Sequence, residues 1–248
     1  MSADFRNGPS GGAPASRRWI KGLSHIVSRL VAREPVMLAT LFAIGGALWA
    51  FIALAGEVLE GDSHTFDRVV LLALRDPLDP AVPLGPRWLE QVARDVTSLG
   101  SVTVLVLLTV AVAGYLLLIH RRALAALMLA SIGGGSLLSA LLKGAFGIPR
   151  PDVVPHAVEA YTTSFPSGHA MLSAVTYLTL AALLAGAQEQ ARVKVYLIVV
   201  AIALAVLVGV SRIYLAVHWP TDVLAGWCVG SAWAMLCWLV ARKLRFTQ

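Results

Sequence analysis

The sequence predicts an all-α, polytopic membrane protein whose six transmembrane helices form one bundle. Of its 248 residues, 58% are hydrophobic and only 14% are charged, whereas a soluble domain has about 25% charged residues. Six stretches lack Asp, Glu, Lys and Arg, and each is long enough, or nearly so, to cross a bilayer as a helix. The basic residues are also distributed unevenly between the segments that join these stretches.

The six predicted spans follow one another along the chain. They cover residues 35–56, 99–119, 123–142, 170–188, 195–211 and 223–241, and the fifth is the shortest with 17 residues. The first stretch has a competing interpretation as a cleaved signal peptide, because Ala53-Leu54-Ala55 resembles a cleavage site. Its apolar part is longer than the core of about 7–15 residues that such signals have, so we favour a transmembrane span.

The basic residues predict that both termini are cytoplasmic. In that orientation the inner segments hold 13 of the 20 Lys and Arg residues, and the outer segments hold seven, together with 11 of the 14 acidic residues. We therefore expect a multi-pass protein of a bacterial-type inner membrane. The net charge of +6 is explained by basic residues in the inner segments, where they are attracted to anionic lipids. It does not indicate nucleic acid as a partner.

Two segments lie outside the predicted spans. Residues 1–34 form a basic tail, predicted to be cytoplasmic, and residues 35–248 form the membrane domain. Within that domain, residues 57–98 are an outer interfacial segment. Its second half, "PRWLEQVARDVTSLG", has an apolar helical face that includes Trp88 and Val92, which predicts an amphipathic helix in the interface. That helix could border a gap for lipid entry or pack on the bundle as a spacer, and we favour the spacer.

The alternating helix directions bring four helix ends to the outer face. The third helix ends near Lys143 and the fifth at Arg212, while the fourth begins at "PSGH" and the sixth at "HWPTD". Arg150 lies in the loop before the fourth helix. Three cations therefore converge on two helix N-termini, whose free N–H groups and partial positive charge bind anions. Phosphate is the anion that this arrangement best predicts, because arginines contact its oxygens in a forked geometry.

Two histidines stand at the same helix starts. His218 and Asp222 are four residues apart and share a helical face, so the carboxylate could fix the ring tautomer and leave the other nitrogen free to attack. His169, next to Gly168, could donate a proton to a leaving oxygen. The plainer alternatives are a helix N-cap at Ser167 with a histidine beside it by chance, and a helix-entry salt link. No further ligands stand at a spacing that fits a metal.

Three motifs in this order resemble the signature of the type 2 phosphatidic acid phosphatase superfamily. They are Lys143-x6-Arg150-Pro151, Pro166-Ser167-Gly168-His169 and Ser211-Arg212-x5-His218-x3-Asp222. The six-helix layout is similar to the integral membrane branch of a superfamily that also includes soluble vanadium haloperoxidases. The resemblance implies that His218 is the nucleophile, Asp222 its partner and His169 the acid. It also implies that the phosphate is held by Lys143, Arg150, Ser167, Gly168 and Arg212.

The activity that follows is hydrolysis of a membrane lipid phosphate or diphosphate through a phosphohistidine, without a metal or cofactor. Candidate substrates are undecaprenyl diphosphate, phosphatidylglycerol phosphate, phosphatidic acid and lysophosphatidic acid. A lipid phosphotransferase with the same site is the alternative. A transporter or channel is less favoured, because the charges cluster at helix ends and none lines the interior of a span. A haloperoxidase is disfavoured because those relatives are soluble.

Overall fold

The computed structural model describes residues 35–61, 63–148, 150–151 and 163–245. The predicted cytoplasmic tail, residues 1–34, lies outside them. Residues 1–42 and residues 43–248 form separate compact units. Of the first unit the structure describes only the beginning of one helix, and the helix bundle belongs to the second unit. The predicted limits of the membrane domain stay a prediction.

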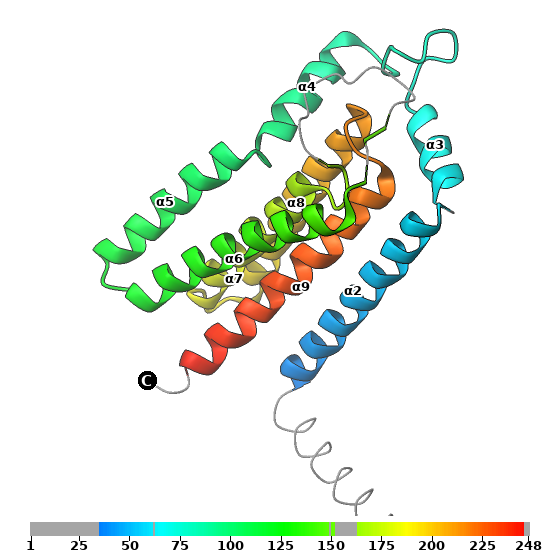
Figure 1. Cartoon of the computed structure of the whole chain (residues 1–248). Coiled ribbons are helices and arrows are strands. Elements are labelled where there is room, and N and C mark those ends of the chain that lie inside the picture. Colours follow the sequence, from blue (N-terminus) through cyan, green and yellow to red (C-terminus); the bar gives the residue numbers. More distant parts are fainter. Residues whose placement is uncertain (1–34, 62, 149, 152–162, 246–248) are drawn as a thin grey trace, which may run out of the picture. The chain divides into compact units, whose positions relative to one another are not determined.

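The described residues form eight helices and no β-strand, which confirms the all-α class (Figure 1). The helices are α2 (Pro35–Glu60), α3 (His64–Leu72), α4 (Arg87–Ser98), α5 (Val102–Leu118), α6 (Arg122–Phe146), α7 (Gly168–Gly186), α8 (Ala191–Tyr214) and α9 (Pro220–Arg245). Five of them, α2, α6, α7, α8 and α9, are long and apolar enough to cross a membrane. The pair α4 and α5, bent by 46° at a short break, counts as a sixth span if taken together.

The span lengths differ from the predicted ones in two places. The stretch predicted to be shortest, 195–211, belongs to α8, which has 24 residues. The prediction from uncharged residues underestimated the length of this helix, because Arg192, Lys194 and Arg212 lie within its first and last turns. The stretch 99–119 forms α5, which has only 17 residues. It is one of the candidate membrane-spanning helices only if α4 and α5 are taken together.

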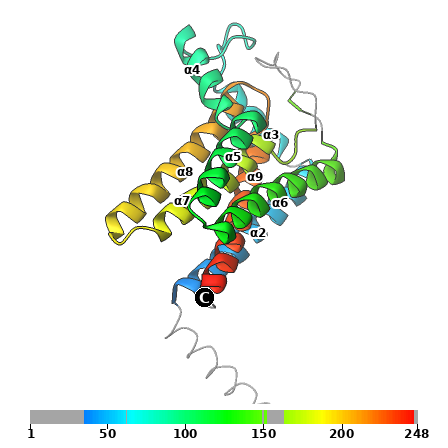
Figure 2. The ribbon, with the colours of Figure 1, turned by 90° about the vertical axis from the view of Figure 1, so that its left-hand side faces the viewer.

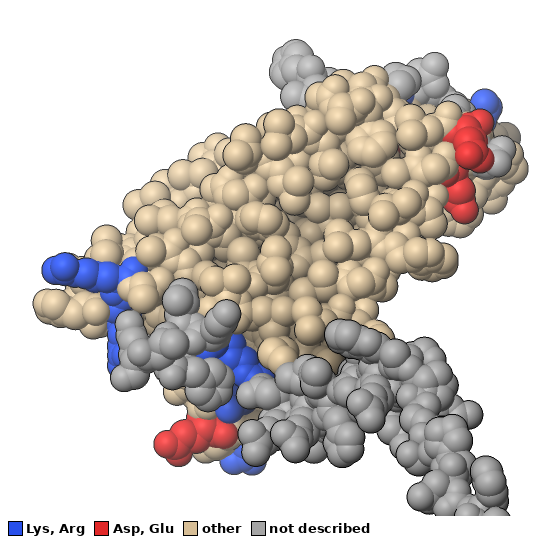
Figure 3. Space-filling model, turned by 60° about the horizontal axis from the view of Figure 1, so that its bottom comes forward, with Lys and Arg blue, Asp and Glu red and all other residues tan. Residues whose placement is uncertain are grey.

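The bundle has a broad uncharged surface. Figure 3 shows a face without charged residues over most of its area, with Lys, Arg, Asp and Glu gathered toward its ends. Large apolar side chains are exposed on the helices, including Leu107 and Leu118 on α5 and Val199 and Ile202 on α8. An exposed apolar surface of this extent fits lipid rather than water. The chain is therefore a membrane protein with several apolar helices.

Helix α7 is the centre of the bundle. It packs against α5, α6, α8 and α9 (Figures 1 and 2), and most of its residues are buried. Its neighbours approach closely because glycines face it: a Cβ on Gly226 or Gly230 of α9 would lie 2.7 or 2.5 Å from a backbone oxygen of the segment that begins α7. Such close backbone contact is what holds helices together in a bilayer.

Three phenylalanines support the segment just before α7. Phe165 is fully buried and packs against Phe146 of α6, with ring centroids 4.9 Å apart, and against Phe51 of α2 at 5.9 Å. Ala55 and Ala225 belong to the same cluster. The beginning of α7 is thereby held in place from two sides.

The predicted amphipathic helix is present as α4, but part of its apolar face is exposed, while Leu89 and Val96 are half-buried. Trp88 and Val92 are 65% and 44% exposed, whereas Ala93 and Thr97 are buried. Ala93 packs with Leu215 and Val217, just after α8. Helix α4 therefore packs on the bundle, against α8, as favoured. Its location in the membrane interface stays a prediction. Helix α3, which was not predicted, precedes it.

Candidate active site

The polar residues at the four predicted helix ends come together. Lys143 lies in the last turn of α6 and Arg212 in the last turn of α8, while Asp222 lies in the first turn of α9. Ser167 is the N-cap of α7 and accepts a hydrogen bond from the Ala170 N–H at 3.4 Å. Its own N–H donates to the backbone oxygen of Asp222 at 2.9 Å. This bond joins the beginnings of α7 and α9.

The predicted contact between His218 and Asp222 is present. Nδ1 of His218 lies 3.2 Å from Oδ2 of Asp222, and both side chains are buried, with at most 2% exposed. The same carboxylate oxygen accepts the N–H of Trp219 at 3.0 Å. Asp222 therefore orients the His218 ring and also fixes the position of the backbone at Trp219.

The neighbours of His218 define its tautomer. Arg150 Nη1 lies 3.1 Å from Nε2 of His218, and a guanidinium can only donate hydrogen bonds. Nε2 therefore carries the lone pair, and the proton is on Nδ1, where Asp222 accepts it. A neutral imidazole held in this way presents a nucleophilic nitrogen next to a cation.

Ser164 belongs to the site, although its position in the sequence did not mark it. Its buried hydroxyl donates to Oδ2 of Asp222 and lies 3.2 Å from Nδ1 of His218. Ser164 thus adds a second group that holds the histidine and the carboxylate together. The only sequence signal is its place five residues before His169, close to the "PSGH" motif but outside it.

The three cations lie around this pair. Arg150 donates to the Val217 carbonyl at 2.6 Å, and Lys143 Nζ donates to the Thr163 carbonyl at 2.5 Å. A Cβ on Gly168 would lie 3.4 Å from Lys143 Cε, so the lysine passes directly beside the start of α7. Burial lowers the pKa of Arg150, and the charge of Asp222 opposes that shift.

Arg212 is the most isolated of these cations. It is 5% exposed, and its Nη1 donates to Thr97 Oγ1 of α4 at 3.1 Å. Its Nε has no hydrogen-bond partner, and no acidic group lies within ion-pair distance of it, among the residues that the structure describes. A buried charge without a counter-ion is costly, so this guanidinium is suited to an anionic ligand.

His169 lies in the first turn of α7. A Cβ placed on Gly100 would lie 3.4 Å from its side chain, so the α4–α5 junction covers it. Arg212, His218, Arg150 and Lys143 all act electrostatically on its ring. The ring is therefore part of the same cluster, although no hydrogen bond joins it to another described residue.

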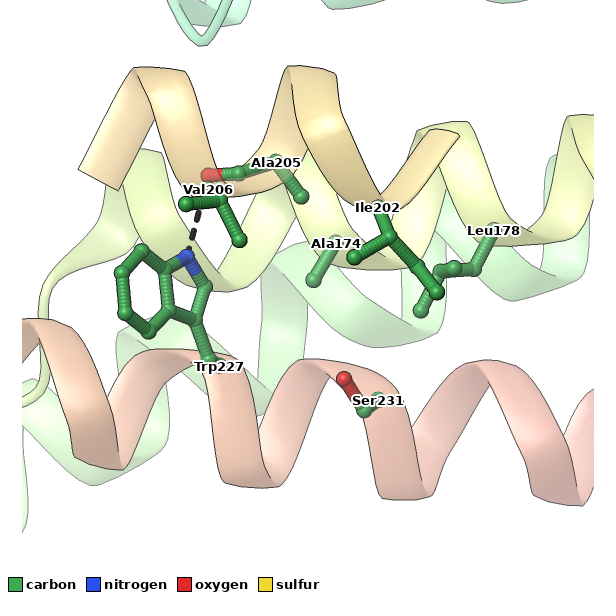
Figure 4. A pocket seen from close by; sticks show the side chains of 7 residues that line it. All are labelled: Ala174, Leu178, Ile202, Ala205, Val206, Trp227 and Ser231. Carbon is green, nitrogen blue, oxygen red and sulfur yellow. Dashed lines mark hydrogen bonds between the residues drawn. The ribbon is translucent and has the colours of Figure 1, made fainter. Parts of the chain in front are cut away.

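Elsewhere in the described residues, neither a metal-binding group nor the pocket offers a comparable cluster of charged side chains. The described part of the chain contains no group of three or more His, Cys, Asp or Glu residues that could hold a metal ion. A pocket between α7, α8 and α9, lined by Leu178, Ile202 and Trp227 among others, holds no charged side chain (Figure 4). The charged cluster at the helix ends is thus the candidate active site.

Known proteins resemble the chain in sequence. The sequence model of the PAP2 superfamily matches residues 124–246, which contain all eight residues of the predicted site. Phosphatidylglycerophosphatase B of Bacillus subtilis is 36% identical over 151 residues, 60% of this chain and 74% of that protein. Undecaprenyl-diphosphatase of Sulfolobus acidocaldarius is 43% identical over 68 residues, 27% of this chain and 29% of that protein.

A solved structure resembles the fold. It is the crystal structure of a transmembrane PAP2-type phosphatidylglycerolphosphate phosphatase from Bacillus subtilis. The two structures superpose with a TM-score of 0.72 and 29% sequence identity, covering 82% of this chain and 98% of that one. The likeness therefore extends beyond the motifs to nearly the whole of that protein.

Proposed function

The chain belongs to the PAP2 superfamily, and we propose that it is a lipid phosphate phosphatase that hydrolyses phosphatidylglycerol phosphate. The names of the Bacillus relatives support this substrate first. Undecaprenyl diphosphate is the second candidate, supported by the shorter match to an undecaprenyl-diphosphatase. Both substrates present a phosphate at the end of a membrane lipid.

The cationic cluster, in which Arg212 is buried and Lys143 and Arg150 are half-buried, carries the proposal. Arg212 has no acidic partner among the described residues, and Arg150 touches Nε2 of His218 at 3.1 Å. A phosphoryl group at Nε2 would therefore meet Arg150 directly, while Lys143 and Arg212 lie within electrostatic reach of that arginine. The first N–H groups of α7 have no partner within the helix and add further donors beside Gly168.

The first chemical step is transfer of the phosphoryl group to His218. The lone pair of Nε2 attacks phosphorus, the P–O bond to the lipid breaks, and His169 gives its proton to the departing oxygen. The resulting imidazolium keeps its Nδ1 proton, which Asp222 stabilises. Charge on the phosphoryl oxygens is balanced by preorganised cations, which is the main source of rate in phosphoryl transfer.

The second step is hydrolysis of the phosphohistidine. A water molecule gives a proton to His169 and attacks phosphorus, the P–N bond breaks, and inorganic phosphate leaves. His218 regains its Nε2 lone pair and His169 regains its proton, so both residues are ready for another turnover. Side-chain cations supply the positive charge in this scheme, and no step calls for a metal or a cofactor.

The proposed location of the site is the outer face of an inner membrane. The uneven distribution of basic residues supports cytoplasmic termini, and in that orientation the alternating helix directions support a site on the outer side. A lipid headgroup at that leaflet could reach the cations without leaving the membrane. The segment 57–98, which covers part of this end, would lie on the same side.

Release of inorganic phosphate by the purified protein tests the proposal. We expect turnover of phosphatidylglycerol phosphate in detergent micelles and, if the second candidate also applies, of undecaprenyl diphosphate. His218→Ala should abolish turnover and the acid-labile phosphoprotein. His120→Asn is the matched control, because that histidine is exposed at the turn between α5 and α6, and it should keep wild-type activity.

The same assay distinguishes the alternative enzyme class. A phosphotransferase would yield a phosphorylated acceptor lipid in place of free phosphate when both lipids are supplied. Wild-type protein that releases no phosphate from any lipid phosphate or diphosphate would contradict the proposed hydrolase. Ion flux across pure liposomes, without phosphate release, would favour a transporter instead.

A further inference from the structure

Residues 211–222, the catalytic segment, depend on two helix ends. Arg212 belongs to the end of α8, Asp222 to the beginning of α9, and His218 lies in the short connection between them. The position of His218 relative to its neighbours is therefore set by how both ends are held. Each end has backbone groups that need partners from outside its own helix.

The first turn of α9 takes its cap from another helix. Trp219 precedes the helix and has no side-chain oxygen that could cap it, and Pro220 has no N–H. The N–H of Thr221 instead donates to Oδ1 of Asp67 at 3.0 Å, and its hydroxyl donates to Oδ2 at 2.7 Å. Asp67 lies on α3, 154 residues away in the chain, and replaces the usual local N-cap.

The last turn of α8 also has a backbone carbonyl whose partner comes from the segment around α3. The carbonyls of residues 211, 212 and 213 accept the N–H groups of residues 215, 217 and 216. The carbonyl of Tyr214 accepts from Nη2 of Arg75 at 2.7 Å. Arg75 follows α3 by three residues, so a short stretch of chain serves both helix ends.

The charges match the helix ends that they contact. A carboxylate at an N-terminus and a guanidinium at a C-terminus both stabilise a helix through its dipole. Asp67 and Arg75 are each 3% exposed, and neither has an ion pair within the described ranges. Burial raises the pKa of Asp67 and lowers that of Arg75. Burial therefore disfavours the charged form of both side chains. Between them, Leu71 packs on Ala216 and Trp219.

We propose that Asp67 and Arg75 are positioning residues that hold the catalytic segment from the outer side. This inference rests on the proposed phosphatase function and gives a role to the first part of segment 57–98. Neither residue touches the reacting atoms. They act through Thr221 and Tyr214, which in turn place Asp222 and Arg212.

Paired variants test the role of Asp67. Asp67→Ala removes both acceptors, so we expect kcat for lipid phosphate to fall about 10- to 100-fold with KM little changed. Thr221→Val removes only the hydroxyl, so its kcat should fall several-fold, again with KM little changed. Asp67→Asn keeps one acceptor and should stay within about fivefold of the wild type. Thr221→Ser keeps the hydroxyl and should therefore have the kcat of the wild type. Asp95→Asn, an exposed acid on α4, is the control.

Arg75→Met tests the other end, and we expect the same kind of loss, about tenfold in kcat. Hydrogen–deuterium exchange of residues 215–223 provides a readout that does not need turnover. Asp67→Ala and Arg75→Met should speed exchange there and leave α6 and the second half of α7 unchanged. If Asp67→Ala does not fold, the Thr221→Val and Thr221→Ser pair carries the test.

Three outcomes would overturn the inference. The first is wild-type kcat in both Asp67→Ala and Arg75→Met. The second is unchanged exchange of residues 215–223 in both variants. The third is a loss in Thr221→Ser as large as that in Thr221→Val, which would indicate general destabilisation. A wild-type protein without phosphatase activity would instead contradict the proposed function, and the exchange measurement alone would then decide whether the two helix ends are held as proposed.

Discussion

Gly226→Ala should reduce activity because the active site depends on the close approach of α9 to α7. A Cβ at Gly226 would lie 2.7 Å from the Ser167 carbonyl oxygen and 3.2 Å from the Met171 nitrogen. These are backbone atoms at the start of α7, which cannot rotate away as a side chain can. Helix α9 must move instead.

The size of the movement follows from ordinary contact distances. Such a contact normally begins at 3.4 Å, so the beginning of α9 must shift by about 0.7 Å in a tightly packed interior. That shift lengthens the 2.9 Å bond between the Ser167 N–H and the Asp222 oxygen. Overpacking of this kind costs about 1–3 kcal/mol of stability, and misplacement of reacting groups by about 1 Å costs about 100-fold in rate. We expect kcat to fall about 10- to 100-fold.

The assay compares kcat, KM and the thermal unfolding temperature in one detergent. Gly133→Ala is the matched control, because a Cβ at that position of α6 meets no atom within 4 Å; it should leave kcat unchanged. Wild-type kcat in Gly226→Ala would refute the reasoning. So would an equal fall in the Gly133 control, because that would trace the loss to any added methyl group in the bundle.

Four further predictions concern the chemistry and the membrane orientation. His169→Ala should lose about 10²–10⁴-fold on a lipid phosphate but less in phosphoenzyme formation from an aryl phosphate, whose leaving group needs no proton; equal losses on both would exclude a general acid. Ser164→Ala should lower kcat about tenfold by removing one hydrogen bond to the carboxylate, and a wild-type rate would make that hydroxyl dispensable. Chelators should leave turnover intact and vanadate should inhibit it, whereas loss in EDTA that Mg²⁺ restores would contradict a site based on side-chain cations. An impermeant thiol reagent should label a cysteine at position 79 from outside and one at position 190 only after permeabilisation; the reverse pattern would place the site in the cytoplasm.

The helices and the central pair of the site could be predicted from the sequence because both depend on local spacing. Uncharged stretches of about 20 residues mark membrane helices without any tertiary information. The contact between His218 and Asp222, observed at 3.2 Å, follows from a separation of four residues on a helix. The alternation of helix direction then brought Lys143 and Arg212 to the same end as these two residues, as predicted.

The orientation of α4 shows where such reasoning fails. Its apolar side chains predicted a face but could not say whether lipid or protein covers it, because both are apolar. In the structure Trp88 stays exposed, while the small residue Ala93 and the polar Thr97 pack on the bundle. Thr97 then contacts Arg212, which no periodicity in α4 indicates.

The supporting residues of the site were decided by the tertiary structure alone. Ser164 meets Asp222 across 58 residues of sequence, Arg75 meets Tyr214 across 139, and Asp67 meets Thr221 across 154. Nothing in the local sequence distinguishes these from the other serines, arginines and aspartates outside the six predicted spans. Asp67 and Arg75 bond to backbone groups that helix ends leave without partners, and Ser164 bonds to a carboxylate. Only the packed bundle determines which distant side chain is near enough to each of these groups.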